Sequence, residues 1–164
     1  MRRLSPALLA LALAACDSKP APGPAPTATS KAGPRASGPR FEKAPEGADF
    51  AAIARERRAA AEAEGRKLLI YVGAPWCEPC QHFHRAVEQG KLDETFAGLT
   101  FLELDVEVDR ARLLGAGYAS RYIPLFAAPG PDGRMTRFIE GSIKGEGAVA
   151  EITPRLVRLL EGKL

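Results

Sequence analysis

The sequence predicts an α/β fold in which helical segments alternate with buried strands. Residues 67–73 (KLLIYVG) form one continuous apolar run, which is typical of a strand covered on both faces. Residues 101–108 alternate between apolar and acidic side chains, which indicates a second strand. With the helical patterns around these two runs, we expect the element order α-β-α-β-α-β-β-α, and no internal repeat is visible.

The first half of this fold is predicted by helix caps and periodicity. Asp49 is a suitable N-cap for a helix over 49–64, which has apolar residues along one side and is followed by Gly65. After the apolar strand, we expect a helix over 77–89. A short helix over 109–116 should follow the alternating strand.

The second half contains two strands and a final helix. Residues 125–128 and 134–140 are candidate strands, and the Pro-Gly-Pro-Asp-Gly segment between them is a strong turn signal. Thr153 and Pro154 are suited to the N-cap and first position of the last helix. These assignments give four strands.

Residues 1–15 are expected to be a signal peptide. Arg2 and Arg3 precede an apolar stretch of eleven residues, which is too short to cross a hydrocarbon core of about 30 Å. The Leu-Ala-Ala sequence that leads into Cys16 resembles the lipobox of bacterial lipoproteins, which implies cleavage before Cys16 and its lipidation. Ordinary secretion is the alternative. Asp17 resembles an inner-membrane retention signal, which implies the periplasmic face of the inner membrane.

Residues 16–45 are predicted to be the lipidated cysteine and a disordered linker, with a folded domain over 46–164. Seven of the fourteen prolines lie between residues 17 and 45, among Ala, Gly, Ser and Thr. Such a segment buries too little surface to offset its ordering entropy. Proline-rich chain extends by about 3.1 Å per residue, so the linker could reach about 90 Å.

The balance of basic and acidic residues gives no electrostatic reason to expect nucleic-acid binding. The chain has 23 basic and 20 acidic residues, and removal of Arg2 and Arg3 with the leader leaves 21 basic residues. There is no basic stripe and no run of aromatic residues on which bases could stack. We therefore expect no nucleic-acid partner.

The chemistry is concentrated in the segment that joins the apolar strand to the following helix. Cys77 and Cys80 lie in the first turn of that helix, where unpaired N–H groups and partial positive charge stabilise a thiolate. Cys77 can attack a substrate disulfide, and Cys80, one turn further along, can resolve the mixed disulfide. Pro79 stiffens the turn between them, and Trp76 provides an apolar lip beside Cys77.

The sequence Trp-Cys-Glu-Pro-Cys at 76–80, after an apolar strand, resembles the active-site motif of the thioredoxin superfamily. Ile123-Pro124, 44 residues after Cys80, resembles the cis-proline of that family, which helps to bind the substrate chain. The resemblance covers residues 49–164. It implies a thioredoxin-like fold with a central mixed four-stranded sheet and helices on both faces. It also implies catalysis by the dithiol itself, without a cofactor.

The Glu-Pro pair between the cysteines resembles the extracytoplasmic reducing members of the family. The charge of Glu78 should make the Cys77 thiolate less stable than it is in strong oxidants. We therefore expect a membrane-tethered, monomeric reductase of protein disulfides in the cell envelope. Its electrons would come from a membrane partner.

Three points stay open at this stage. Thioredoxin has a buried aspartate six residues before its first active-site cysteine, whereas this chain has Tyr71, and Glu103 or His84 could take over its role. Cys77, Cys80 and His84 share one helix face, so a copper- or zinc-binding lipoprotein is the main alternative function. A third possible function is a binding module that keeps the fold but has lost catalytic turnover.

Overall fold

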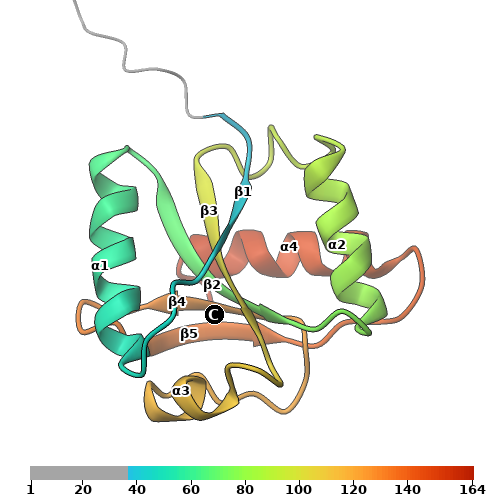
Figure 1. Ribbon diagram of the computed structural model, residues 1–164. Helices are drawn as coiled ribbons and strands as arrows, with labels where there is room; N and C mark the ends of the chain where they lie inside the picture. The colour runs from blue at the N-terminus through green and yellow to red at the C-terminus, as the bar shows by residue number, and fades with distance from the viewer. Residues whose placement is uncertain (1–36) are drawn as a thin grey trace, which may run out of the picture. The chain divides into compact units, whose positions relative to one another are not determined.

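A five-stranded mixed sheet forms the centre of residues 37–164, the part of the chain that the computed structural model describes (Figure 1). Its order is β1-β3-β2-β4-β5, in which β1, β3 and β2 run parallel and β4 and β5 are each antiparallel to the preceding neighbour. The strands are β1 (Arg40–Lys43), β2 (Lys67–Gly73), β3 (Leu99–Asp105), β4 (Leu125–Pro129) and β5 (Met135–Glu140).

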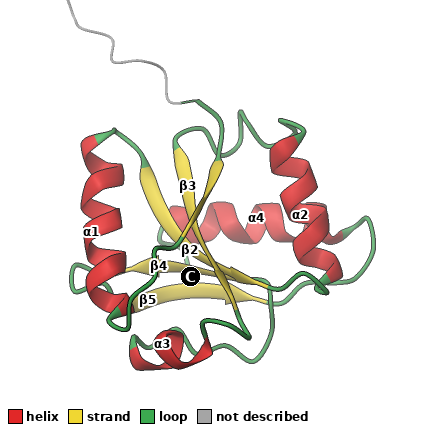
Figure 2. Cartoon of the chain, in the orientation of Figure 1, coloured by secondary structure: helices red, strands yellow, loops and turns green. Residues whose placement is uncertain are grey.

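Helices cover both faces of this sheet (Figure 2). The helices are α1 (Phe50–Ala63), α2 (Glu78–Glu88), α3 (Arg110–Gly115) and α4 (Ala148–Leu160). One apolar core lies between the sheet and α2 with α4, and the other lies between the sheet and α1 with α3. In β2, Leu69 and Tyr71 belong to the first core, and Leu68 and Ile70 belong to the second. The strand is covered on both faces, which explains its unbroken apolar sequence.

Most of the predicted elements are confirmed within a residue or two. The helix after Asp49 is present, and the Asp49 carboxylate accepts a hydrogen bond from the Ala52 N–H at 3.0 Å, as expected of an N-cap. The central mixed sheet with helices on both faces is also present. It has one strand more than the four that we predicted.

The extra strand corrects the expected boundary between linker and domain. Arg40–Lys43 pairs in parallel with β3, although we assigned residues 16–45 to the linker. The strand is held by Phe41, the one large apolar residue of that segment, whose ring lies 5.1 Å from those of Tyr71 and Phe101. The expected signal peptide, Cys16 and most of the linker lie outside the described residues.

Arg66 fixes the chain just before β1. Its guanidinium is buried and donates hydrogen bonds to the backbone carbonyls of Ser37, Gly38 and Leu99 and to the hydroxyl of Thr100. Burial lowers the pKa of Arg66 below its ordinary value. A buried guanidinium needs partners for its N–H donors. Here those partners lie both on the segment before β1 and at the start of β3, so Arg66 links the two.

Two other predicted boundaries are wrong. The strand over 101–108 ends at Asp105, because the Asp105 carboxylate accepts hydrogen bonds from the N–H groups of Glu107 and Val108 and turns the chain. The final helix begins at Ala148 rather than at Thr153, so Pro154 lies inside it. The hydroxyl of Thr153 donates to the carbonyl of Val149 at 2.7 Å instead of capping the helix.

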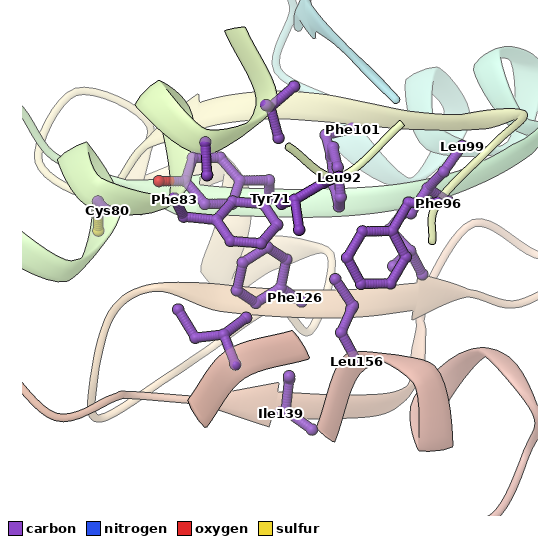
Figure 3. Close-up of a cluster of buried hydrophobic side chains, with 14 of the residues drawn as sticks. Tyr71, Cys80, Phe83, Leu92, Phe96, Leu99, Phe101, Phe126, Ile139 and Leu156 are labelled. Carbon is purple, nitrogen blue, oxygen red and sulfur yellow. The ribbon is translucent and has the colours of Figure 1, made fainter. Parts of the chain in front are cut away.

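Aromatic side chains hold α2 against the sheet. Phe83 is fully buried, and its ring lies 4.8 Å from that of Phe126 and 5.5 Å from that of Phe101. Figure 3 shows these rings packed together with Tyr71, and Cys80 lies at one side of the cluster. The helix that carries both cysteines is therefore fixed by a dry core.

Within residues 37–164, no helix is both long enough and apolar enough to span a bilayer.

Candidate active site

A disulfide joins Cys77 and Cys80 at the start of α2. Cys77 is the N-cap of that helix, and its Sγ accepts a hydrogen bond from the backbone N–H of Cys80 at 3.3 Å. Both cysteines are almost fully buried, with 4% and 2% of their surfaces exposed. A thiolate at Cys77 would accept the same N–H at the positive end of the helix, so the backbone is already arranged to stabilise it.

The residues around the cysteines differ in exposure. Trp76 precedes Cys77 and leaves 63% of its surface exposed, as expected of a lip rather than of a core residue. Pro79 is buried in the first turn of α2, where its missing N–H has no helical partner to lose. Glu78 is exposed, and its carboxylate accepts a hydrogen bond from the Gly145 N–H at 3.1 Å.

The peptide bond between Ile123 and Pro124 is cis, as the family resemblance implied. Val72 on β2 pairs with Leu125 on β4, so the antiparallel register places Pro124 beside Gly73. Gly73 is the last residue of β2, where the segment that leads to Cys77 begins. The sheet register thus brings the cis-proline to the edge that carries the disulfide.

Tyr122 was missed as a candidate surface residue. We assigned Tyr122 no role from the sequence, but 61% of its surface is exposed, directly before the cis peptide bond. Its backbone N–H is within hydrogen-bond distance of the Glu140 carboxylate. Its position next to Ile123 was the one signal in the sequence that could have indicated an exposed Tyr122. The identity of an aromatic residue does not by itself tell whether it is buried or exposed.

A cavity of about 550 Å³ lies behind the disulfide. Cys80, Tyr71, His84 and Glu103 all line it. The Nε2 atom of His84 lies 2.7 Å from Oε1 of Glu103, and the His84 ring stacks on Phe41 at 3.7 Å between centroids. The structure therefore brings together both groups that the sequence offered in place of the buried aspartate.

Tyr71 contributes a hydroxyl to this cavity that has no hydrogen-bond partner among the described residues. In Figure 3 this oxygen leaves the aromatic cluster on the side where Cys80 lies. Burial first, and the carboxylate of Glu103 second, raise the pKa of Tyr71 well above its ordinary value, so the hydroxyl stays protonated. A side chain at Gly73 would come within 2.7 Å of this hydroxyl, so glycine leaves it room.

The alternative metal site receives no support from the described residues. Within 37–164, no three His, Cys, Asp or Glu side chains come together as a group that could hold a metal ion. The cysteines are bonded to each other, and His84 is paired with Glu103.

Comparison with known proteins gives one match by sequence family. A family model described as thioredoxin-like matches residues 50–129. No curated protein sequence matches the chain.

Solved structures similar to this chain include two thioredoxins. A mutant thioredoxin from Halobacterium salinarum is 19% identical, with 77% of this chain and 90% of that chain covered and a TM-score of 0.44. Oxidised thioredoxin O1 from Arabidopsis thaliana is 15% identical, with 76% and 96% covered and a TM-score of 0.42.

Proposed function

The chain belongs to the thioredoxin superfamily, and from this premise we propose that it is a thiol–disulfide oxidoreductase of the cell envelope that reduces protein disulfides. The observation that carries the proposal is the disulfide at the start of α2, in which Cys77 is the N-cap and Cys80 follows in the same turn. Membership supports thiol–disulfide exchange in general; the envelope location, the substrate class and the direction are our inferences.

In the proposed reaction the two cysteines carry both electrons. The Cys77 thiolate attacks one sulfur of a substrate disulfide, and the other substrate sulfur leaves as a thiolate that takes up a proton from water. The Cys80 thiolate then attacks Sγ of Cys77, which releases the second substrate sulfur. Two electrons have passed to the substrate, and the protein ends with the Cys77–Cys80 disulfide. A dithiol partner in the membrane would have to reduce that bond.

An exposed apolar surface supports a protein substrate. Trp76 directly precedes the first cysteine, and Tyr122 directly precedes the Ile123–Pro124 bond, and both aromatic rings are mostly exposed. Rigid aromatic side chains of this kind bind an extended peptide at low entropic cost. We therefore assign substrate contact to Trp76, Ile123 and Pro124, with Pro79 shaping the turn.

The direction of electron flow is tested by the midpoint potential. We expect a value closer to about −270 mV, as in thioredoxin, than to about −120 mV, as in strong oxidants. The negative charge of Glu78 opposes a thiolate at Cys77, and a less stable reduced form is a better reductant. Equilibration of the protein with dithiothreitol mixtures of known ratio measures the potential.

The matched variants for this measurement lie at the two ends of α2. Glu78→Gln should move the potential to a less negative value, whereas Glu88→Gln, at the far end of the helix, should leave it unchanged. A wild-type potential near −120 mV would contradict the proposed direction. Such a potential would not contradict thiol–disulfide exchange itself.

The proposed tether is tested by fractionation of cells that produce the full chain. We expect the processed wild-type protein in the membrane fraction. Cys16→Ser should instead be found in the soluble fraction or as the uncleaved precursor, because serine has no thiol to carry the lipid. Cys80→Ser is the matched control, since it removes a cysteine without affecting the lipobox. If Cys16→Ser stayed in the membrane fraction as a processed protein, the lipid tether would be wrong.

A further inference from the structure

The segment that leads into the cis-proline has no regular secondary structure. Residues 119–124 lie in neither a helix nor a strand, so their N–H groups have no place in a hydrogen-bond ladder. The segment nevertheless presents Tyr122 and the exposed Arg121 directly before the Ile123–Pro124 bond. A loop that binds a substrate chain binds it more tightly when it is already held in one conformation.

The carboxylate of Glu140 holds this segment. Its Oε2 atom accepts hydrogen bonds from the backbone N–H of Arg121 at 2.8 Å and from that of Tyr122 at 3.4 Å. Resting on the proposed reduction of protein disulfides, we propose that Glu140 is a positioning residue. It keeps Arg121 and Tyr122 in the arrangement that contacts a protein substrate.

The end of β5 brings Glu140 to this segment. Glu140 is the last residue of β5 and pairs with Leu125, the residue that follows the cis-proline. One residue further, the N–H of Gly141 donates to the carbonyl of Pro124 at 2.9 Å. Gly141 has a φ of +66°, and a Cβ there would lie 3.0 Å from Cβ of Tyr122, so glycine permits this close approach. The segment is thus held by backbone at the proline and by a side chain just before it.

The backbone that carries Glu140 is itself fixed to α4. The guanidinium of Arg155 donates to the carbonyls of Glu140 at 2.8 Å and Gly141 at 2.9 Å, and it pairs with Glu151 at 2.6 Å. Its planar N–H donors suit two successive carbonyls. A stripe of fully buried apolar residues anchors α4 in the core. The Glu140 carboxylate therefore extends from backbone that is tied to the rigid part of the fold.

The two side chains that this carboxylate positions are available to a partner. The guanidinium of Arg121 lies 6.0 Å from the centre of the Tyr122 ring, at the outer limit of a cation–π contact, and both side chains are exposed. A polypeptide bound across the cis-proline would extend over them, whereas a small disulfide needs only the sulfur of Cys77. Loss of the Glu140 carboxylate should therefore weaken the binding of proteins and leave the sulfur chemistry unchanged.

The test compares two substrates of the full chain, a disulfide-bonded test protein and a small chromogenic aromatic disulfide, with dithiothreitol as the electron donor. We expect Glu140→Leu to raise KM for the test protein about tenfold, as the loss of one hydrogen bond to a charged group would. Its kcat should be unchanged, because the lost interaction holds the binding surface. The rate with the aromatic disulfide should equal that of the wild-type protein.

Glu140→Gln tests whether hydrogen bonding is the cause. Glutamine keeps an oxygen that can accept the same N–H groups, so we expect a KM much closer to the wild-type value than that of Glu140→Leu. Glu146→Leu is the matched control, because Glu146 is an exposed glutamate six residues further along the chain. If Glu140→Leu matched this control, the inference would be overturned. Equal KM values for the Gln and Leu variants would also overturn it.

Amide hydrogen exchange reports on the held segment directly. We expect Glu140→Leu to speed exchange at Arg121 and Tyr122 and to leave the amides of β2 unchanged. Faster exchange throughout the sheet, with equal losses of rate on both substrates, would show a less stable fold and refute a positioning role. If the wild-type protein reduced neither substrate, the proposed function would be wrong, and the exchange rates would still decide whether Glu140 holds the segment.

Discussion

Cys77→Ser is expected to lower the rate of disulfide reduction by about three orders of magnitude or more, because a serine hydroxyl cannot replace a thiolate as the attacking group. The proposed reaction begins at this sulfur, which caps α2 and faces the Cys80 N–H. The measurement is the reduction of a disulfide-bonded test protein, with dithiothreitol as the electron donor.

Cys80→Ala gives the informative contrast for this prediction. It keeps the attacking sulfur but removes the resolving one, so we expect a covalent adduct between Cys77 and the test protein that dithiothreitol releases. The adduct should be absent from the variant that combines Cys77→Ser with Cys80→Ala. Turnover that persists in Cys77→Ser, or an adduct formed through Cys80 in the wild-type protein, would contradict the assigned roles.

Phe83→Ala is expected to lower the free energy of unfolding by about 3–5 kcal/mol, the usual effect of removing a buried aromatic ring. Phe83 is fully buried between α2 and the sheet, where it contacts Phe41, Phe101 and Phe126. Urea unfolding of the oxidised protein, followed by circular dichroism, measures the change.

Phe138→Ala is the control for the size of this effect. Phe138 lies on the edge strand β5 and is 43% exposed, so its removal leaves no closed cavity and should cost about 1 kcal/mol or less. If both variants lowered the free energy of unfolding by similar amounts, the packing of Phe83 would not be the main contact that holds α2 against the sheet.

The sequence predicted the elements whose periodicity is set by burial. β2 is apolar throughout because it is covered on both faces, and α1 begins at a clear N-cap at Asp49. The CxxC segment and the cis-proline were predictable as a resemblance, since the residue types and their order carry the information. These predictions needed no knowledge of how distant segments pair.

β1 was missed because its stability is not local. Three of its four residues are Arg, Glu and Lys, and only Phe41 is apolar, so neither alternation nor propensity indicates a strand. The segment is extended because it pairs with β3 and because Phe41 packs on rings from β2, β3 and α2. Tertiary contacts of this kind are not visible in four residues of sequence.

The start of α4 was placed too late because a local signal outweighed a longer pattern. Thr153-Pro154 is a good helix start, but Ala148, Ile152, Leu156 and Leu159 form one buried stripe through it. Burial of that stripe compensates for the backbone hydrogen bond that Pro154 cannot donate. A proline inside a helical pattern is thus tolerated when the apolar face continues on both sides.

The pairing of His84 with Glu103 was only half predictable. The sequence placed His84 on the face of Cys80, since helical spacing is fixed. It could not place Glu103 there, because the partner of a strand residue depends on sheet register. Tyr71 pairs with Glu103 in the structure, and this register brings the carboxylate under α2.

The hydrogen bonds of Arg66 to the carbonyls of Ser37 and Gly38 have a mechanical consequence. A pull on the chain ahead of Ser37 would load these bonds before it could strain β1 and, through Phe41, the imidazole of His84. The length or composition of the preceding segment can therefore change without displacing Phe41 from the rings of β2 and β3, provided that the change lies upstream of Ser37.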